Sequence, residues 1–269
     1  MNRIDELFRQ LRESGRKGFI PFITAGDPDL DMSLQIAVKL ADLGASIIEL
    51  GVPFSDPMAD GPTIQLSSQR ALKKGVDLAS VLRLVREFRK TSDVSIVLFS
   101  YLNPLLTYGL DELARDASDA GIDGVLVTDA VDNEAQAIRG ILNDRDLKLI
   151  SLIAPTTTDE RLRTIGRSAD GFLYAVSRAG VTGAKSEMSL EAEQLVGRAR
   201  NFSELPIVVG FGISTAEQIA DVWRYSDAAV VGSAIVNQIA GAQMGEEVLA
   251  VERFVCSLLP RFAKSGAEI

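Results

Sequence analysis

The chain has 269 residues, which is long enough to bury one large hydrophobic core. Lys and Arg number 28 against 37 for Asp and Glu, and the net charge of -9 disfavours non-specific binding to nucleic acid or to anionic lipid. Histidine is absent, which excludes Ser-His-Asp and Cys-His nucleophile systems and the usual His-containing zinc sites. Proton transfer must therefore depend on carboxylates, lysine or tyrosine.

The first residues, MNRIDELFRQLRESG, predict an amphipathic helix. Its apolar face consists of Ile4, Leu7, Phe8 and Leu11. The stretch mixes both charge signs, unlike a signal peptide, and no apolar run approaches the roughly 18 to 20 residues that span a bilayer. We therefore expect a cytoplasmic protein that binds neither membrane nor nucleic acid. The single cysteine, Cys256, lies in a helical pattern near the C-terminus, and we expect a buried, unreactive thiol.

Eight short apolar runs rich in β-branched residues predict strands. They lie at about residues 19–25, 46–52, 95–101, 124–128, 148–154, 171–176, 206–210 and 228–232. Between them apolar residues recur at helical spacing, so strands and helices alternate. With a length near the ~250 residues usual for this architecture, the pattern predicts one α/β domain over residues 1–269. We expect a (β/α)8 TIM barrel with an extra N-terminal helix, and an open doubly wound sheet is the alternative.

Two helix starts have capping-box spacing, Thr157 with Glu160 and Ser214 with Glu217. The second unit (46–94) and the sixth (171–205) are longer than the others. Loops after the strands build the active face of such barrels, and unusually long loops are often functional. We therefore expect the functional residues in these two units.

In the second unit, IIELGVPFSDPMADGPTIQ places Glu49 near the end of an otherwise apolar strand. A carboxyl group that points into a barrel loses hydration, which raises its pKa and suits it to both donate and accept a proton near neutral pH. The alternative is a glutamate held in a structural ion pair. The following loop carries Asp56 and Asp60, and loop aspartates more often only cap turns or stay solvated.

Three glycine-rich loops follow the last three predicted strands: GVTG at 180–183, GFGIS at 210–214, and VGSAIV around Gly232 and Ser233. Such loops expose backbone N–H groups, and in barrels the loops after strands seven and eight frequently hold phosphate. Ordinary turn chemistry is the alternative for each loop alone. Together they favour a phosphate site that needs little positive charge.

Aromatic residues at the same strand ends complete a candidate pocket. Phe22 lies in the first predicted strand, Tyr174 in the sixth, and Phe211 between the two glycines of GFGIS. Such residues usually fill a core, but the Tyr174 hydroxyl would lie on the same rim as Glu49 and could hydrogen-bond a substrate.

The string ELGVPFSDPMADGPTIQ closely resembles the tryptophan synthase α-subunit family, as do SRAGVTGA (177–184), GFGIS (210–214) and GSAIV (232–236). The resemblance runs through the whole chain, and the first string is its most specific part. It implies cleavage of indole-3-glycerol phosphate to indole and glyceraldehyde 3-phosphate without a metal or cofactor in this chain. It also implies a partner, the pyridoxal-phosphate-containing β subunit, in an α2β2 complex.

Position by position, the resemblance implies that Glu49 is the acid and base catalyst and that Asp60 accepts a hydrogen bond from the indole N–H. Tyr174 would lie against the ring and Glu49. The backbone at Gly183, Gly212, Gly232 and Ser233 would bind phosphate, and Phe22 and Thr182 would flank the substrate. The loops at 53–60 and 178–190 would close over it.

Two segments depart from the family pattern. TDAVDNE (128–134) replaces a Pro-rich stretch, and SYLNP after the third strand keeps only part of the usual pattern. Neither includes the proposed catalysts. Both lie where family members contact the β subunit or line the ring pocket, so we expect differences in that contact rather than in the chemistry.

Three other kinds of function fit part of the pattern: another phosphate-binding barrel enzyme, a regulatory subunit and a lyase without a partner. A sugar-phosphate isomerase or a lysine-imine aldolase would explain the glycines but not Asp60. A barrel kept mainly as a regulatory subunit would need no catalyst at all. A stand-alone indole-3-glycerol phosphate lyase would need no partner.

Overall fold

The computed structural model describes residues 2–130, 132–176, 185–210 and 212–259. Eight parallel strands are hydrogen-bonded in chain order and close into a barrel in which β1 pairs with β8. The predicted TIM barrel is therefore confirmed, and the open sheet is wrong. The strands are β1 (Gly18–Thr24), β2 (Ile47–Gly51), β3 (Ser95–Ser100), β4 (Gly124–Val127), β5 (Lys148–Ile153), β6 (Leu173–Val176), β7 (Ile207–Gly210) and β8 (Ala228–Val231).

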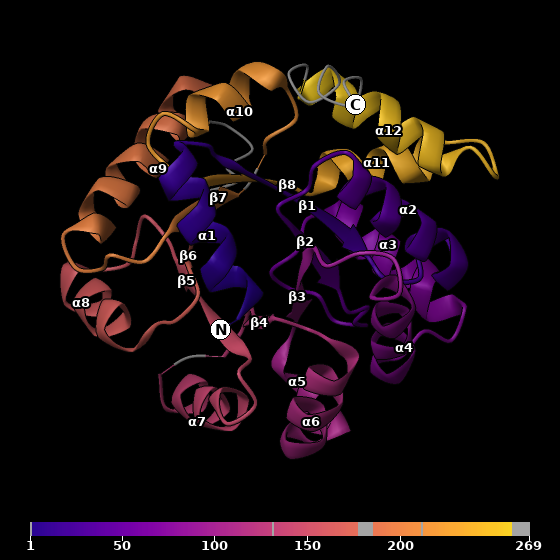
Figure 1. The fold of residues 1–269 in the computed structure, drawn as a ribbon, viewed down its shortest axis with the longest axis horizontal. Coiled ribbons are helices and arrows are strands. Elements are labelled where there is room, and N and C mark those ends of the chain that lie inside the picture. Colours follow the sequence, from indigo (N-terminus) through magenta and orange to yellow (C-terminus); the bar gives the residue numbers. More distant parts are fainter. Residues whose placement is uncertain (1, 131, 177–184, 211, 260–269) are drawn as a thin grey trace.

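Helices surround the barrel (Figure 1). The extra length of the second unit is a second helix, since both α3 and α4 follow β2, whereas the sixth unit contains the long helix α9. The helices are α1 (Arg3–Ser14), α2 (Leu30–Asp42), α3 (Pro62–Lys73), α4 (Leu78–Phe88), α5 (Leu102–Tyr108), α6 (Leu110–Ala120), α7 (Asp132–Asn143), α8 (Asp159–Ser168), α9 (Lys185–Arg200), α10 (Ala216–Val222), α11 (Ser233–Gly241) and α12 (Glu247–Leu258).

The N-terminal helix α1 lies across one end of the barrel (Figure 1). Its buried residues Ile4, Phe8 and Leu11 belong to the same apolar cluster as the inward side chains of the strands. The ring of Phe8 packs against that of Phe172 with centroids 5.6 Å apart. Because this end is covered by apolar packing, the other end, where the strands have their carboxyl ends, is left for a site.

Strand residues alternate between an inner and an outer apolar cluster. Ile20 of β1 and Ile47 of β2 belong to the inner cluster, whereas Ile23 and Ile48 belong to the outer cluster beneath the helices. Since successive side chains point to opposite faces, the inner series in β2 continues from Ile47 to Glu49. The fold therefore directs this carboxyl group into the barrel.

The two predicted capping boxes are each one residue too early. Helix α8 is capped by Thr158, because the hydroxyl of Thr157 instead accepts a hydrogen bond from the backbone N–H of Ala154 (2.9 Å) and closes the preceding turn. Helix α10 has a capping box formed by Thr215 and Gln218. The hydroxyl side chains next to each other in these turns compete for the cap, and spacing alone did not distinguish them.

The prediction of a buried thiol is wrong. Cys256 is partly exposed on α12, because the buried face of this helix is formed by Val251, Val255 and Leu258. Among the described helices, none is long and apolar enough to cross a bilayer.

Candidate active site

A cavity of about 270 Å³ lies at the carboxyl ends of the strands. It brings together residues from β1, β2, β6 and β8 and from the loops that follow β2, β7 and β8. Seven predicted site residues line it: Phe22, Glu49, Asp60, Tyr174, Gly212, Gly232 and Ser233. Three others, Thr182, Gly183 and Phe211, lie outside the described residues.

Glu49 is fully buried, with an exposed fraction of 0%, on the inner face of β2. Neither carboxyl oxygen has a hydrogen-bond partner among the described residues, which include no ion-pair partner for Glu49. Burial raises the pKa of Glu49 to about 8. The side chain therefore carries its proton at neutral pH, and it can donate that proton to a bound molecule and later recover one.

Tyr174 lies on the inner face of β6 and lines the same cavity as Glu49. Burial, and then the charge of Glu49, raise the pKa of its hydroxyl well above the ordinary value, so this group stays protonated. Gly210 in the adjacent strand β7 makes room for it, since a Cβ at this position would lie 2.2 Å from the Tyr174 hydroxyl oxygen. Gly210, the first glycine of GFGIS and the last residue of β7, thus has a packing role that the sequence pattern did not indicate.

Phe22 forms part of the cavity wall next to Glu49. It is paired in register with Glu49, because β1 and β2 are neighbours. Its ring packs edge-on against Phe99 of β3, with centroids 5.3 Å apart. A Cβ on Gly51 would lie 2.5 Å from the Phe22 ring, so this glycine at the end of β2 leaves the space that the ring occupies. The result is an apolar wall beside the buried acid.

Asp60 lies in the loop between β2 and α3, at the mouth of the same cavity. The hydroxyl of Tyr101 donates a hydrogen bond to its Oδ2 (3.1 Å) and accepts one from the backbone N–H of Ala59 (2.9 Å). Burial raises the pKa of Asp60, and the hydrogen bond from Tyr101 opposes this shift. Tyr101, which also packs on Phe54 of the loop, was missed in the sequence, although it lies in the SYLNP segment directly after β3.

Helix α3 is tied to β1 and its following loop, and this fixes the segment that carries Asp60. Arg70 of α3 donates two hydrogen bonds of 2.7 Å to the two carboxyl oxygens of buried Asp27. One turn earlier, the hydroxyls of Ser67 and Thr24 lie 2.6 Å apart. Asp60 directly precedes Gly61, the N-cap of α3, so the position of the helix sets the position of the carboxylate.

The start of a helix also lines the cavity and presents backbone N–H groups. Helix α11 begins at Ser233, its N-cap residue Gly232 offers no side-chain cap, and both residues line the cavity. The first N–H groups of an α-helix have no partner within the helix and attract anions. Gly212 has φ +68, in the left-handed region that favours glycine, and borders the same space. Among the described lining residues there is no Lys or Arg.

The described residues include no group of three or more His, Cys, Asp or Glu side chains that could hold a metal ion. Among the described lining residues, the polar groups are the carboxyl groups of Glu49 and Asp60, the hydroxyls of Tyr174, Ser214 and Ser233, the amide of Asn237 and the backbone amides.

The sequence profile described as "Tryptophan synthase alpha chain" matches residues 8–261. The chain belongs to this family. A tryptophan synthase alpha chain of Pelobacter propionicus is 48% identical and covers 96% of this chain and 97% of its own length. The alpha chain of Phenylobacterium zucineum is also 48% identical, over 92% of this chain and 90% of its own length.

Solved structures agree with the sequence comparison. The alpha subunit of tryptophan synthase from Legionella pneumophila has a TM-score of 0.90 at 36% identity, covering 98% of this chain and 99% of its own. A chain of the tryptophan synthase complex from Pyrococcus furiosus has a TM-score of 0.83 at 37% identity, covering 90% and 98%. The resemblance noted in the sequence is thereby confirmed. The reaction of tryptophan synthase alpha chains is the cleavage of indole-3-glycerol phosphate in tryptophan biosynthesis, a carbon–carbon lyase reaction.

Proposed function

We propose that the cavity at the carboxyl ends of the strands binds indole-3-glycerol phosphate, with Glu49 as the acid and base catalyst. The phosphate would bind the backbone N–H groups at the start of α11 and at Gly212. The indole ring would lie against Phe22, with its N–H directed to Asp60. Thr182 and Gly183 would add to the phosphate side, and Phe211 to the ring side.

Cleavage begins with protonation of indole C3. Glu49 is suited to this step, because burial holds its proton at neutral pH and no described side chain competes for its oxygens. Protonation at C3 places positive charge on the ring nitrogen. The Asp60 carboxylate stabilises that charge through the hydrogen bond from the ring N–H, and Tyr101 holds the carboxylate in place.

The bond between C3 and the glycerol side chain then breaks. Its electron pair returns to the ring and restores the aromatic indole, while the adjacent hydroxyl becomes the aldehyde of glyceraldehyde 3-phosphate. The hydroxyl proton passes to Glu49, which regains the form in which it started. Tyr174, protonated and next to Glu49, orients the reacting side chain. No metal or cofactor in this chain takes part in these steps.

The observation that carries this assignment is the buried, unpartnered carboxyl group of Glu49 in the same cavity as Asp60. The test is to incubate the purified chain with indole-3-glycerol phosphate and to measure both products. Glu49→Gln should retain substrate binding and lose turnover by a factor of about 10² to 10⁴ or more. Asp60→Asn should lose about 10² to 10³. Near-normal turnover of Glu49→Gln would refute the assignment, and a covalent lysine adduct trapped by borohydride would favour an aldolase mechanism.

We further propose that a pyridoxal-phosphate-containing β subunit docks at the rim of this cavity, in a cytoplasmic α2β2 complex. Two apolar side chains that follow strand ends support the position: Met58 is 92% exposed and Leu106 is 53% exposed. Large exposed apolar side chains at one rim favour a protein contact. Addition of the β subunit should raise the rate of indole release, because ordering the loop at 53–60 excludes water and completes the site. Equal rates with and without it would indicate a stand-alone lyase.

A further inference from the structure

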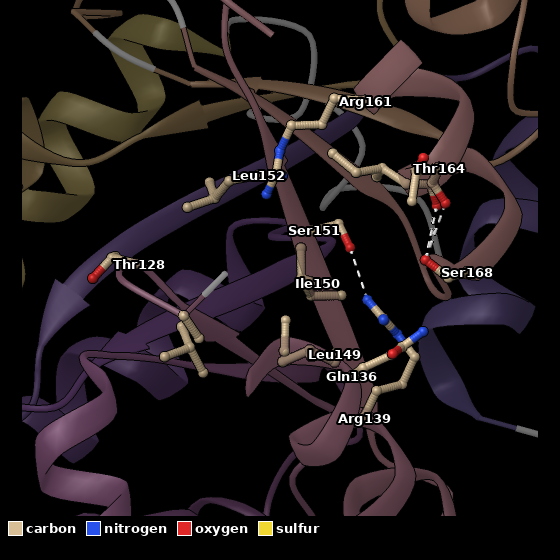
Figure 2. A pocket seen from close by; sticks show the side chains of 14 residues that line it. Thr128, Gln136, Arg139, Leu149, Ile150, Ser151, Leu152, Arg161, Thr164 and Ser168 are labelled. Carbon is tan, nitrogen blue, oxygen red and sulfur yellow. Dashed lines mark hydrogen bonds between the residues drawn. The ribbon is translucent and has the colours of Figure 1, made fainter. Parts of the chain in front are cut away.

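A second cavity, of about 280 Å³, lies outside the barrel wall, between α7 and α8 over the outward face of β5 (Figure 2). It shares no described lining residue with the active-site cavity. Leu149 of β5 belongs to the outer apolar cluster, so Leu149 and, two residues on, Ser151 face the helices rather than the barrel interior. The space is therefore a separate site in the outer layer of the fold.

Two arginines from different helices reach this space. Figure 2 shows Arg139 extending from α7 towards Ser151, and Arg161 extending from α8 towards Leu152. The described lining residues include no carboxylate, although the whole chain has a net charge of -9. Hydroxyl groups from β5 and α8 also border it, including those of Ser151 and Thr164. This combination of charge and donors suits an anion.

The hydrogen bonding of Arg139 is incomplete. Its side chain is only 13% exposed, and Nη2 donates to the hydroxyl of Ser151 (3.1 Å). The buried Nε lies 3.6 Å from Oδ2 of Asp170, beyond hydrogen-bond distance, and has no acceptor among the described residues. A guanidinium group has five N–H donors, and a buried donor without an acceptor is costly. A bound anion in the cavity would supply this guanidinium group with a further acceptor beside the ion-paired Asp170.

Apolar side chains, among them Val127, Leu149 and Ile165, form much of the rest of the lining, and the polar side chains of Thr128, Gln136 and Ser168 complete it. A volume of 280 Å³ is near the lower end of small-molecule pockets. It suits a ligand with a compact apolar body and one charged group. We propose that this cavity binds a small organic carboxylate, with the carboxylate on Arg139 and the apolar part against the side chains of α7, α8 and β5.

The segment that departs from the family pattern borders this cavity. Thr128 and Ala130 of TDAVDNE line it, as does Ala135 directly after that segment. The departure was unexplained by the lyase chemistry, since no proposed catalyst lies in it. A ligand site formed partly by this segment gives the substitution a function that belongs to this chain rather than to the shared reaction.

The test uses benzoate as the probe and benzyl alcohol as its uncharged counterpart, titrated into the full chain with amide NMR signals as the readout. Benzoate should shift signals of β5, α7 and α8, and benzyl alcohol should bind at least about tenfold more weakly. Arg139→Gln should weaken benzoate binding by a similar factor. Ala135→Leu, which fills the cavity and leaves both arginines in place, should also abolish binding.

Arg163→Gln is the matched control, because this arginine is on α8 but lies over the ring of Phe202 and not in the cavity. It should retain wild-type benzoate binding. The proposal is overturned if benzoate shifts only signals near Ser233, if Ala135→Leu binds it as wild type does, or if the alcohol binds equally well. Indole release does not enter this test, so its outcome is independent of the proposed catalytic residues.

Discussion

Replacing Glu49 with glutamine should change the pH dependence of stability as well as turnover. The pKa of Glu49 is about 8 in the folded chain and about 4.5 for an unburied glutamate. Between these values the folded state holds a proton that the unfolded state has lost. The contribution of this Glu49 proton to the stability of the folded state is therefore fully present below about pH 4.5, and it is lost as the pH rises through 8.

Linkage gives the size of the effect. For one titrating group, the folding equilibrium constant changes by up to tenfold per pH unit inside this window. Over the whole interval from pH 4.5 to 8, the free energy of unfolding therefore changes by on the order of 5 kcal/mol. Glutamine has no proton to lose, so its variant should lack this decline. Urea unfolding of both proteins, repeated at several values between about pH 5 and pH 8, measures the difference.

The free energy of unfolding of Glu49→Gln should rise relative to that of the wild type as the pH increases. Glu204→Gln is the control, because Glu204 is exposed and lies outside the cavity, and it should retain wild-type turnover. Parallel stability curves for the wild type and Glu49→Gln would refute the reasoning, because they would mean that this carboxyl group titrates alike in the folded and unfolded chains.

Three further substitutions test the supporting structure. Tyr101→Phe removes the hydrogen bond to Asp60 but keeps the ring, so kcat/KM for indole-3-glycerol phosphate should fall about tenfold; an unchanged value would mean that Tyr101 does not position Asp60. Gly210→Ala should lower the free energy of unfolding, measured with urea, by about 1 to 3 kcal/mol, because the added Cβ meets the Tyr174 hydroxyl. Adding Tyr174→Phe to this variant removes that hydroxyl and should restore part of the lost stability. If no stability is recovered, the proposed clash is contradicted. Phe8→Ala should cost about 3 to 5 kcal/mol, and a loss below about 1 kcal/mol would show that α1 does not share the barrel core.

The barrel and most of the cavity were predictable because they depend on local patterns. Strand and helix alternation defines the fold, and the side-chain alternation in β2 directs Glu49 inward once the strand is recognised. The glycine loops were recognisable because parallel strands bring their carboxyl ends to one face. Phe22 and Tyr174 followed from the same rule.

Other features depend on contacts between residues far apart in the chain. The bond from Tyr101 to Asp60 joins residues 41 positions apart, and the pair of Arg70 and Asp27 joins residues 43 positions apart. No local spacing predicts such pairs. The role of Gly210 also appears only when β6 and β7 are side by side, since a glycine at the end of a strand is otherwise explained by a turn.

A direct titration of the Glu49 side chain tests the proposed chemistry at its origin. Glutamate carboxyl carbons can be labelled with carbon-13, and the Glu49 signal is identified as the one missing from Glu49→Gln. We predict that this signal stays in the protonated position at neutral pH and moves with a midpoint near 8. A midpoint near the ordinary glutamate value of about 4.5 would contradict the account, because Glu49 would then have no proton to deliver to the indole ring at neutral pH.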